Sequence, residues 1–143
     1  MNELNSVLIE GTLLDEPKRI LLADTEESIR LVKFDIASNR YYMDRKGEKA
    51  KETVFISVQC WGELGEKCIS ILKKGMKVRT VGRLRLCRWV SNDGSTRRTI
   101  EIVANHLEFR RSKAGSTKAE TEILEDSANE AEQTSEAEVF YAF

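Results

Sequence analysis

The feature that most constrains this chain is a strict alternation of apolar and polar side chains from Thr53 to Trp61. In the run Thr-Val-Phe-Ile-Ser-Val-Gln-Cys-Trp, every second residue from Val54 to Cys60 is apolar. A period of two is typical of a half-buried β-strand, whose successive side chains point to opposite faces of a sheet. Phe55 and Trp61 fall on the other, more polar face, so we expect two large rings on the side that meets water.

Exposed rings on a sheet have two interpretations. They can pack under a loop or at a subunit contact, since single exposed aromatic residues are common on protein surfaces. They can also be stacking surfaces for a flat ligand, and the bases of a nucleic acid are the usual one.

A second predicted strand, from Val78 to Val90, repeats the pattern with arginines. One parity holds Leu84 and Leu86, and the other holds Arg83, Arg85, Cys87 and Trp89. An unpaired nucleic-acid strand requires this combination, because bases stack on rings and cations neutralise phosphates. The alternative is an ordinary sheet surface on which the arginines hydrogen-bond carboxylates.

Composition places the chain among globular proteins. Its 143 residues, 41% hydrophobic and 33% charged, predict one domain with an appendage. No apolar run approaches the roughly 18 residues of a membrane span, and the first five residues show no signal peptide. The three cysteines, Cys60, Cys68 and Cys87, are widely spaced, so we expect core thiols in a reducing cytosol and neither a disulfide framework nor a zinc site.

Charge divides the chain into a basic body and an acidic tail. Residues 114–143 hold eight acids and one base, a net charge of −7, whereas the first 113 residues hold 22 bases and 16 acids, a net charge of +6. A basic body indicates a polyanionic partner. From about Ser112 the composition turns to Ser, Thr, Ala and Glu, which predicts a disordered tail.

The remaining elements complete an all-β layout with one helix. Period-two patterns predict strands at 6–14, 30–38 and 97–109, with Ile100, Ile102 and Ala104 inward in the last, and 19–23 is a short strand candidate. Residues 39–52 form a basic hairpin loop that turns at Gly47, and Asp93-Gly94 marks a second hairpin. The apolar stripe of residues 63–74 predicts a helix, with Lys73 and Lys74 in its last turn and Gly75 as its stop. This order predicts a five-stranded OB-fold barrel with one capping α-helix.

The last residues depart from the polar tail, since Phe140, Tyr141 and Phe143 cluster at the end. We interpret this tip as a short docking peptide for another protein, against the alternative of a hydrophobic end without a role. No phosphate-binding loop, nucleophile elbow or metal-ligand cluster occurs, and His106 has no catalytic neighbours in the sequence, so we expect no enzyme, cofactor or metal.

Three motifs together resemble the bacterial single-stranded-DNA-binding protein family. They are Asn5-Ser-Val-Leu-Ile-Glu-Gly-Thr-Leu-Leu-Asp-Glu-Pro17, Trp61-Gly-Glu-Leu-Gly-Glu66 continuing to Leu72-Lys-Lys-Gly75, and Gly82-Arg-Leu-Arg-Leu-Cys-Arg-Trp89. The resemblance implies base stacking on Tyr42, Phe55, Trp61 and Trp89. The alternation of the sequence supports the last three of these. It does not support Tyr42, for which Tyr41 is a possible substitute. The resemblance implies phosphate contacts from Lys33, Arg45, Lys74, Arg83, Arg85 and Arg88.

The resemblance also implies a wider biology. It implies a cytoplasmic, nucleoid-associated homotetramer that binds single-stranded DNA and recruits replication, recombination and repair proteins through Phe140, Tyr141, Ala142 and Phe143. The domains would then be a DNA-binding barrel over 1–112, a linker over 113–134 and a docking tip over 135–143. The open alternatives are an OB-fold RNA-binding or translation-associated module, and an interaction protein whose exposed rings form a subunit or partner contact.

Overall fold

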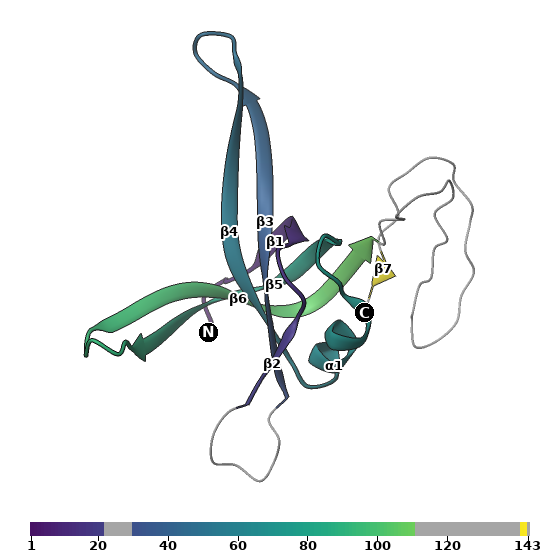
Figure 1. The fold of residues 1–143 in the computed structure, drawn as a ribbon, viewed down its shortest axis with the longest axis vertical. Coiled ribbons are helices and arrows are strands. Elements are labelled where there is room, and N and C mark those ends of the chain that lie inside the picture. Colours follow the sequence, from purple (N-terminus) through teal and green to yellow (C-terminus); the bar gives the residue numbers. More distant parts are fainter. Residues whose placement is uncertain (22–29, 111–140, 143) are drawn as a thin grey trace.

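The computed structural model describes residues 1–21, 30–110 and 141–142, and Figure 1 shows them as a small barrel from which two long hairpins project. The described elements are β1 (Val7–Leu13), β2 (Lys18–Ile20), β3 (Leu31–Met43), β4 (Lys49–Trp61), α1 (Gly62–Ile71), β5 (Lys77–Val90), β6 (Thr96–Arg110) and β7 (Tyr141–Ala142).

Five strands close into the barrel, and this confirms the predicted OB fold. The strands run β1-β5-β6-β4-β3-β2 across the sheet, and β1 also pairs with β3 through Thr12↔Ala37 and Leu13↔Ile36. The β1–β3 pairing closes the strands β1-β5-β6-β4-β3 into a ring. Strand β2 pairs with β3 and is not part of the ring. A short parallel contact, Val58↔Ile102 and Gln59↔Val103, joins β4 to β6.

The core fills the barrel with the inward parity of each strand. Val32, Ile36, Val58 and Ile102 are fully buried there. Helix α1 packs its apolar stripe against the same core through Cys68. Cys60 and Cys68 are buried free thiols, as expected, whereas Cys87 is only part-buried because it stands on the outer face of β5.

The helix ends three residues earlier than predicted. Its last residue is Ile71, and Leu72 takes an extended conformation with φ −77° and ψ 140°. Leu72 is completely buried, so the chain leaves the helix in order to insert this side chain into the core. Lys73 and Lys74 therefore lie outside the last helical turn, and the prediction that they belong to it was wrong.

The segment predicted as a basic loop is mostly paired strand. β3 and β4 pair continuously from Leu31↔Trp61 to Met43↔Lys49, and only residues 44–48 form the turn. Gly47 supplies the left-handed conformation there with φ 78°, as predicted, and Gly94 with φ 81° does so in the turn between β5 and β6. The loop prediction failed because cross-strand pairing outweighs the weak strand propensity of charged residues in this ribbon.

The two hairpins extend beyond the barrel as arms, so inward parity does not guarantee burial. On the β5–β6 arm, Leu84, Leu86 and Ile100 remain 39%, 46% and 54% exposed. Leu86 and Ile100 are direct cross-strand partners, and Leu84 lies two residues from Leu86 on the same face. The sequence predicted the orientation of Ile100 correctly but not its exposure.

The tail predictions fall almost entirely outside the described residues. This holds for the 113–134 linker, for Phe140 and for Phe143. The backbone of Tyr141–Ala142 is described, and it pairs antiparallel with Phe109 and Glu108 at the end of β6. In the described part of the chain no helix has both the length and the apolarity to cross a membrane.

Candidate nucleic-acid interface

Three aromatic side chains stand on the outer face of the sheet. Phe55 and Trp61 share one face of β4, because the β3–β4 ladder has no irregularity between them. Phe55 is 69% exposed and Trp89 on β5 is 47% exposed, while Trp61 is half-buried where β4 meets α1. The structure therefore places all three rings as the alternation predicted, on the side away from the core.

The two tyrosines of β3 lie on opposite faces of their ribbon. The unbroken pairing puts Tyr41 on the Phe55 face and Tyr42 on the other, and the tyrosines are 73% and 41% exposed. Arg40 places its guanidinium 5.1 Å from the centre of the Tyr42 ring, and Lys51 places its amine 5.9 Å from that of Tyr41. Strand register thus favours Tyr41 as the continuation of the aromatic row, whereas the family resemblance pointed to Tyr42.

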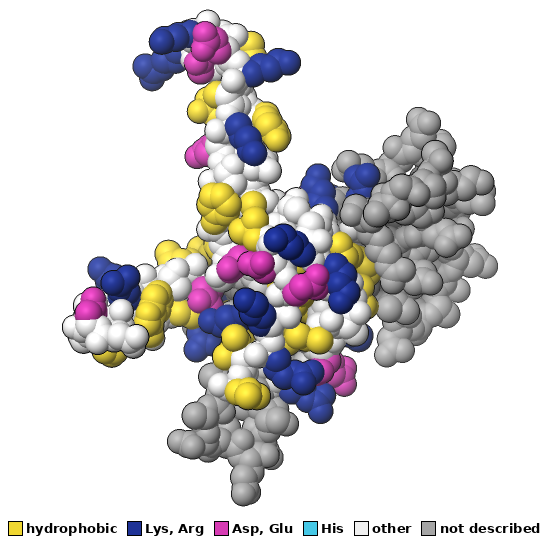
Figure 2. All heavy atoms as spheres, in the orientation of Figure 1, with side chains coloured by type: hydrophobic (Ala, Val, Ile, Leu, Met, Phe, Trp, Pro, Cys, Tyr) yellow, Lys and Arg dark blue, Asp and Glu magenta, His cyan; other side chains and the backbone are white. Residues whose placement is uncertain are grey.

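The predicted cations are spread over both arms and the barrel. Arg83 and Arg85 are exposed on the same face as Trp89, and Arg88 is exposed on the opposite face of that strand. None of these three forms an ion pair with another residue of the described chain. Figure 2 shows Lys and Arg side chains at the ends of both arms, where Arg45 occupies the β3–β4 turn, while Lys74 follows α1.

Lys33 is different from the other predicted phosphate contacts because an acid holds its amine. Its Nζ lies 2.9 Å from Oε2 of Glu101, which is only 6% exposed. Gln59 donates from Nε2 to Glu101 and lies 3.3 Å from the sulfur of Cys87. A polar cluster of Lys33, Gln59, Cys87 and Glu101 therefore occupies the centre of the outer face.

The charge of this cluster is fixed by its hydrogen bonds. Burial acts to raise the pKa of Glu101, but hydrogen bonds from Gln59 and Lys33, together with the Lys33 charge, hold that pKa below its ordinary value. Sequence reasoning missed the cluster, although Gln59 and Glu101 both have outward parity. The missing information was the parallel β4–β6 contact that brings these two strands together.

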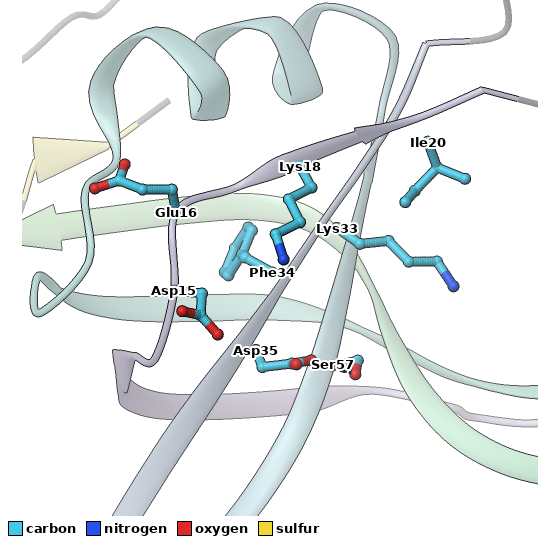
Figure 3. Close-up of a pocket in the computed structure, with 8 residues that line it drawn as sticks. All are labelled: Asp15, Glu16, Lys18, Ile20, Lys33, Phe34, Asp35 and Ser57. Atoms are coloured by element: carbon cyan, nitrogen blue, oxygen red, sulfur yellow. Dashed lines mark hydrogen bonds between the residues drawn. The ribbon is translucent and has the colours of Figure 1, made fainter.

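Two hollows open on the same face and share Asp35 and Ser57. One, of about 220 Å³, lies between β2 and β3 and is lined by Asp15, Glu16 and Lys18 in addition to the shared pair (Figure 3). The other, of about 200 Å³, is lined by Phe55 and by Ile100 and Thr99 of β6. Asp35 accepts a hydrogen bond from the Ser57 hydroxyl.

The groups that this face offers are suited to binding. Among the described residues no group of three or more His, Cys, Asp or Glu side chains is placed to hold a metal ion. His106 lies 3.5 Å from Glu108 on the outer side of β6. What the face presents is rings for stacking, cations for anionic groups and a hollow with polar lining.

Comparison with known proteins agrees with this description. The model of the single-strand binding protein family matches residues 4–110. Single-stranded DNA-binding protein 2 of Chlorobaculum tepidum is 31% identical over 128 residues, which cover 88% of this chain and 85% of that protein. The single-stranded DNA-binding protein of Thermotoga maritima is 31% identical over 123 residues, 85% of this chain and 84% of the relative.

Solved structures show the same fold. A Plasmodium falciparum single-stranded DNA-binding protein in complex with single-stranded DNA superposes with a TM-score of 0.65 at 23% identity, covering 76% of this chain and 97% of that one. The protein from Thermus aquaticus gives a TM-score of 0.64 at 22% identity, over 77% of this chain and 52% of that one. With the family model matched over the whole barrel, this chain belongs to the single-strand binding protein family.

Proposed function

We propose that this chain binds single-stranded DNA without strong sequence preference and without catalysing a reaction. The observation that carries the proposal is the outer face itself, where Phe55, Trp61 and Trp89 stand exposed or half-exposed beside the unpaired cations Arg83 and Arg85. Every base has a π-face, so stacking on these rings accepts any sequence, and the arginines neutralise phosphates along the path. The family membership and the names of the relatives support the same function.

The two arms extend the binding face beyond the barrel. Phe55 lies where β4 leaves the barrel for its arm, and Trp89 lies near the end of the other arm. Arg45 at one tip and Lys74 beside the helix add charge on either side of this path. A flexible DNA strand can follow such a row of separated rings. Each base that stacks on a ring contributes about 1–3 kcal/mol to the binding free energy, as measured by alanine substitution of the ring.

We further propose that the protein works as a homotetramer. The apolar residues Leu84 and Leu86 lie on the face of β5 opposite to Trp89 and are exposed in the single chain, so a second copy is the partner that fits this surface. In this proposal the protein protects single-stranded DNA during replication, recombination and repair in the cytoplasm of a bacterium. The tip from Phe140 to Phe143 recruits the proteins of those processes.

Fluorescence titration with poly-dT tests the binding proposal. The chain has two tryptophans, so each Trp→Ala variant leaves the other as reporter. We expect quenching on binding, and Trp61→Ala and Trp89→Ala should each weaken binding by about 1–3 kcal/mol. Val90→Ala is the control, because it truncates an exposed side chain next to Trp89 on the opposite face.

The same titration separates the alternatives. Constant tryptophan emission at low salt would show that the rings do not stack bases and would favour a protein contact instead. Stronger competition by poly-U than by poly-dT would identify an RNA-binding module on the same fold.

A further inference from the structure

Asp35 is an acid on a face that is otherwise suited to DNA. It is exposed on β3, directly opposite Ser57 of β4, and it shares this face with Phe55. We propose that Asp35 reads the edge of the base stacked on Phe55 and makes this one position favour guanine over thymine. The inference rests on the proposed function and adds a base preference at a single point of a path that is otherwise indifferent to sequence.

The strand register brings Asp35 within reach of a base on that ring. Phe55 pairs with Ala37, and Asp35 is the next residue of β3 on the same face. Diagonal neighbours of this kind lie about 7–8 Å apart. A planar base that stacks on Phe55 can span this distance and direct its edge at Asp35. Ala37 has a methyl side chain only, so nothing bulky stands between the two.

The hollow beside Phe55 has the size and lining for a single base. Its volume is about 200 Å³, below the roughly 300–1,000 Å³ of pockets that enclose a whole drug-sized ligand. Phe55, Ile56 and Ile100 provide apolar walls, and Asp35, Ser57 and Thr99 provide hydrogen-bonding groups. Apolar walls with a few convergent polar groups are the usual lining of a site for a flat ring.

The charges around Asp35 disfavour a phosphate at this place. The adjoining hollow is lined by Asp15 and Asp35, and by Glu16, whose carboxylate accepts a hydrogen bond from the Lys74 backbone N–H and pairs with Lys73. Figure 3 shows the Lys33 side chain extending away from these acids, and its amine is held by Glu101. Lys18 and Lys33 both line the adjoining hollow, so two cations stand against its three acids. An anionic backbone is repelled here, whereas the edge of a neutral base is not.

The chemistry of the carboxylate decides between the bases. An ionised aspartate only accepts hydrogen bonds. Within the described chain, the side chain of Asp35 has one donor, the Ser57 hydroxyl, which donates to its Oδ1. The Watson–Crick edge of guanine presents two adjacent donors, N1–H and the 2-amino group, which suit a carboxylate. Cytosine and adenine present one amino group, and thymine presents one donor between two repelling carbonyl oxygens.

Fluorescence anisotropy with substituted dT oligonucleotides tests the inference. We compare an all-thymidine strand with strands in which every fourth base is guanine or hypoxanthine, since hypoxanthine lacks only the 2-amino group of guanine. We expect the guanine strand to bind about fivefold more tightly than the thymidine strand and the hypoxanthine strand to lie between them. Asp35→Asn should remove this difference, and Asp35→Thr, which suits an exposed strand position, should do the same.

A control separates base reading from general charge. Glu48→Gln removes one carboxylate from the turn of the same hairpin, away from the hollow, so it should strengthen binding of all strands equally and retain the guanine preference. Equal binding of the guanine and thymidine strands by the wild-type protein overturns the inference and leaves the proposed function standing. A preference that persists in both Asp35 variants also overturns it. Failure to bind any of the strands refutes the proposed function and the inference with it.

Discussion

At the scale of single residues, the effective charge of the binding face depends on pairing. Lys33 and Arg85 both stand on the outer face, but Lys33 is held by Glu101 at 2.9 Å. Arg85 has no ion pair within the described chain. A cation that is already neutralised by an acid releases few DNA counterions when a phosphate approaches. The two residues should therefore contribute differently to salt dependence, although the sequence alone presents them as equivalent.

Salt titration measures this difference. For a single strand, the slope of log K against log salt concentration changes by about 0.7 for each phosphate contact that is lost. We expect Arg85→Gln to reduce the slope by about that amount per contact. The double variant Lys33→Gln/Glu101→Gln, which removes an acid and a base together, should leave the slope unchanged. An equal loss of slope in both variants would mean that Lys33 leaves Glu101 to contact DNA.

The tyrosines of β3 give a second residue-scale prediction. The ladder puts Tyr41 on the Phe55 face and Tyr42 on the opposite face, and a cation lies over each ring, Lys51 over Tyr41 and Arg40 over Tyr42. We expect Tyr41→Ala to weaken poly-dT binding by about 1–3 kcal/mol, the range for a lost stacking surface. Tyr42→Ala should cost much less. Isothermal titration of both variants decides between them, and the reverse order would show that the arm twists enough on binding to present Tyr42.

At the scale of elements, the pairing of β5 with β6 is irregular next to Gly82. The β5–β6 register shifts between Val81, which pairs with His106, and Gly82, which pairs with Ala104, so the extra residue is Asn105 of β6. A Cβ placed on Gly82 would lie 2.1 Å from the backbone oxygen of Val103 on the neighbouring strand. The close approach of these two paired backbones therefore requires glycine at position 82.

Gly82→Ala should consequently destabilise the barrel. Forcing apart two paired backbones costs at least as much as overpacking a core, which is about 1–3 kcal/mol, so we expect a fall in melting temperature of roughly 10 °C for a domain of this size. Thermal unfolding followed by circular dichroism measures it. Arg83→Ala alters the next, exposed residue and should change stability by less than about 0.5 kcal/mol. Equal melting temperatures for the two variants would contradict the inference that the close approach of the two backbones requires glycine.

The elements also show what the sequence could predict. Alternation identified the strands at Thr53–Trp61 and Val78–Val90, and the Asp93-Gly94 turn, because these are local properties of a half-buried ribbon. It failed where tertiary structure decides, as in the charged stretch that continues β3 and β4. It also could not reveal the Glu101 cluster, which depends on contacts between β6 and strands distant in the sequence.

At the scale of the whole molecule, the two arms have two different faces. On the β5–β6 arm one face carries Trp89 with Arg83 and Arg85, and the other carries Leu84 and Leu86. Apolar side chains that project beyond a barrel cannot be buried by the barrel itself. Self-association would cover this face and leave the aromatic face open to DNA, so the division of faces allows assembly and binding at the same time.

Charge introduced on the apolar face should therefore dissociate the oligomer. We expect wild-type protein to sediment as a tetramer and the double variant Leu84→Lys/Leu86→Lys to sediment at lower mass, because two adjacent buried lysines would carry a large desolvation cost. Thr99→Lys is the matched control, since Thr99 pairs with Cys87, the residue after Leu86, and faces the DNA side. It should leave the mass unchanged. Wild-type protein that sediments as a monomer, or a double variant that stays tetrameric, would place the subunit contact elsewhere or remove it.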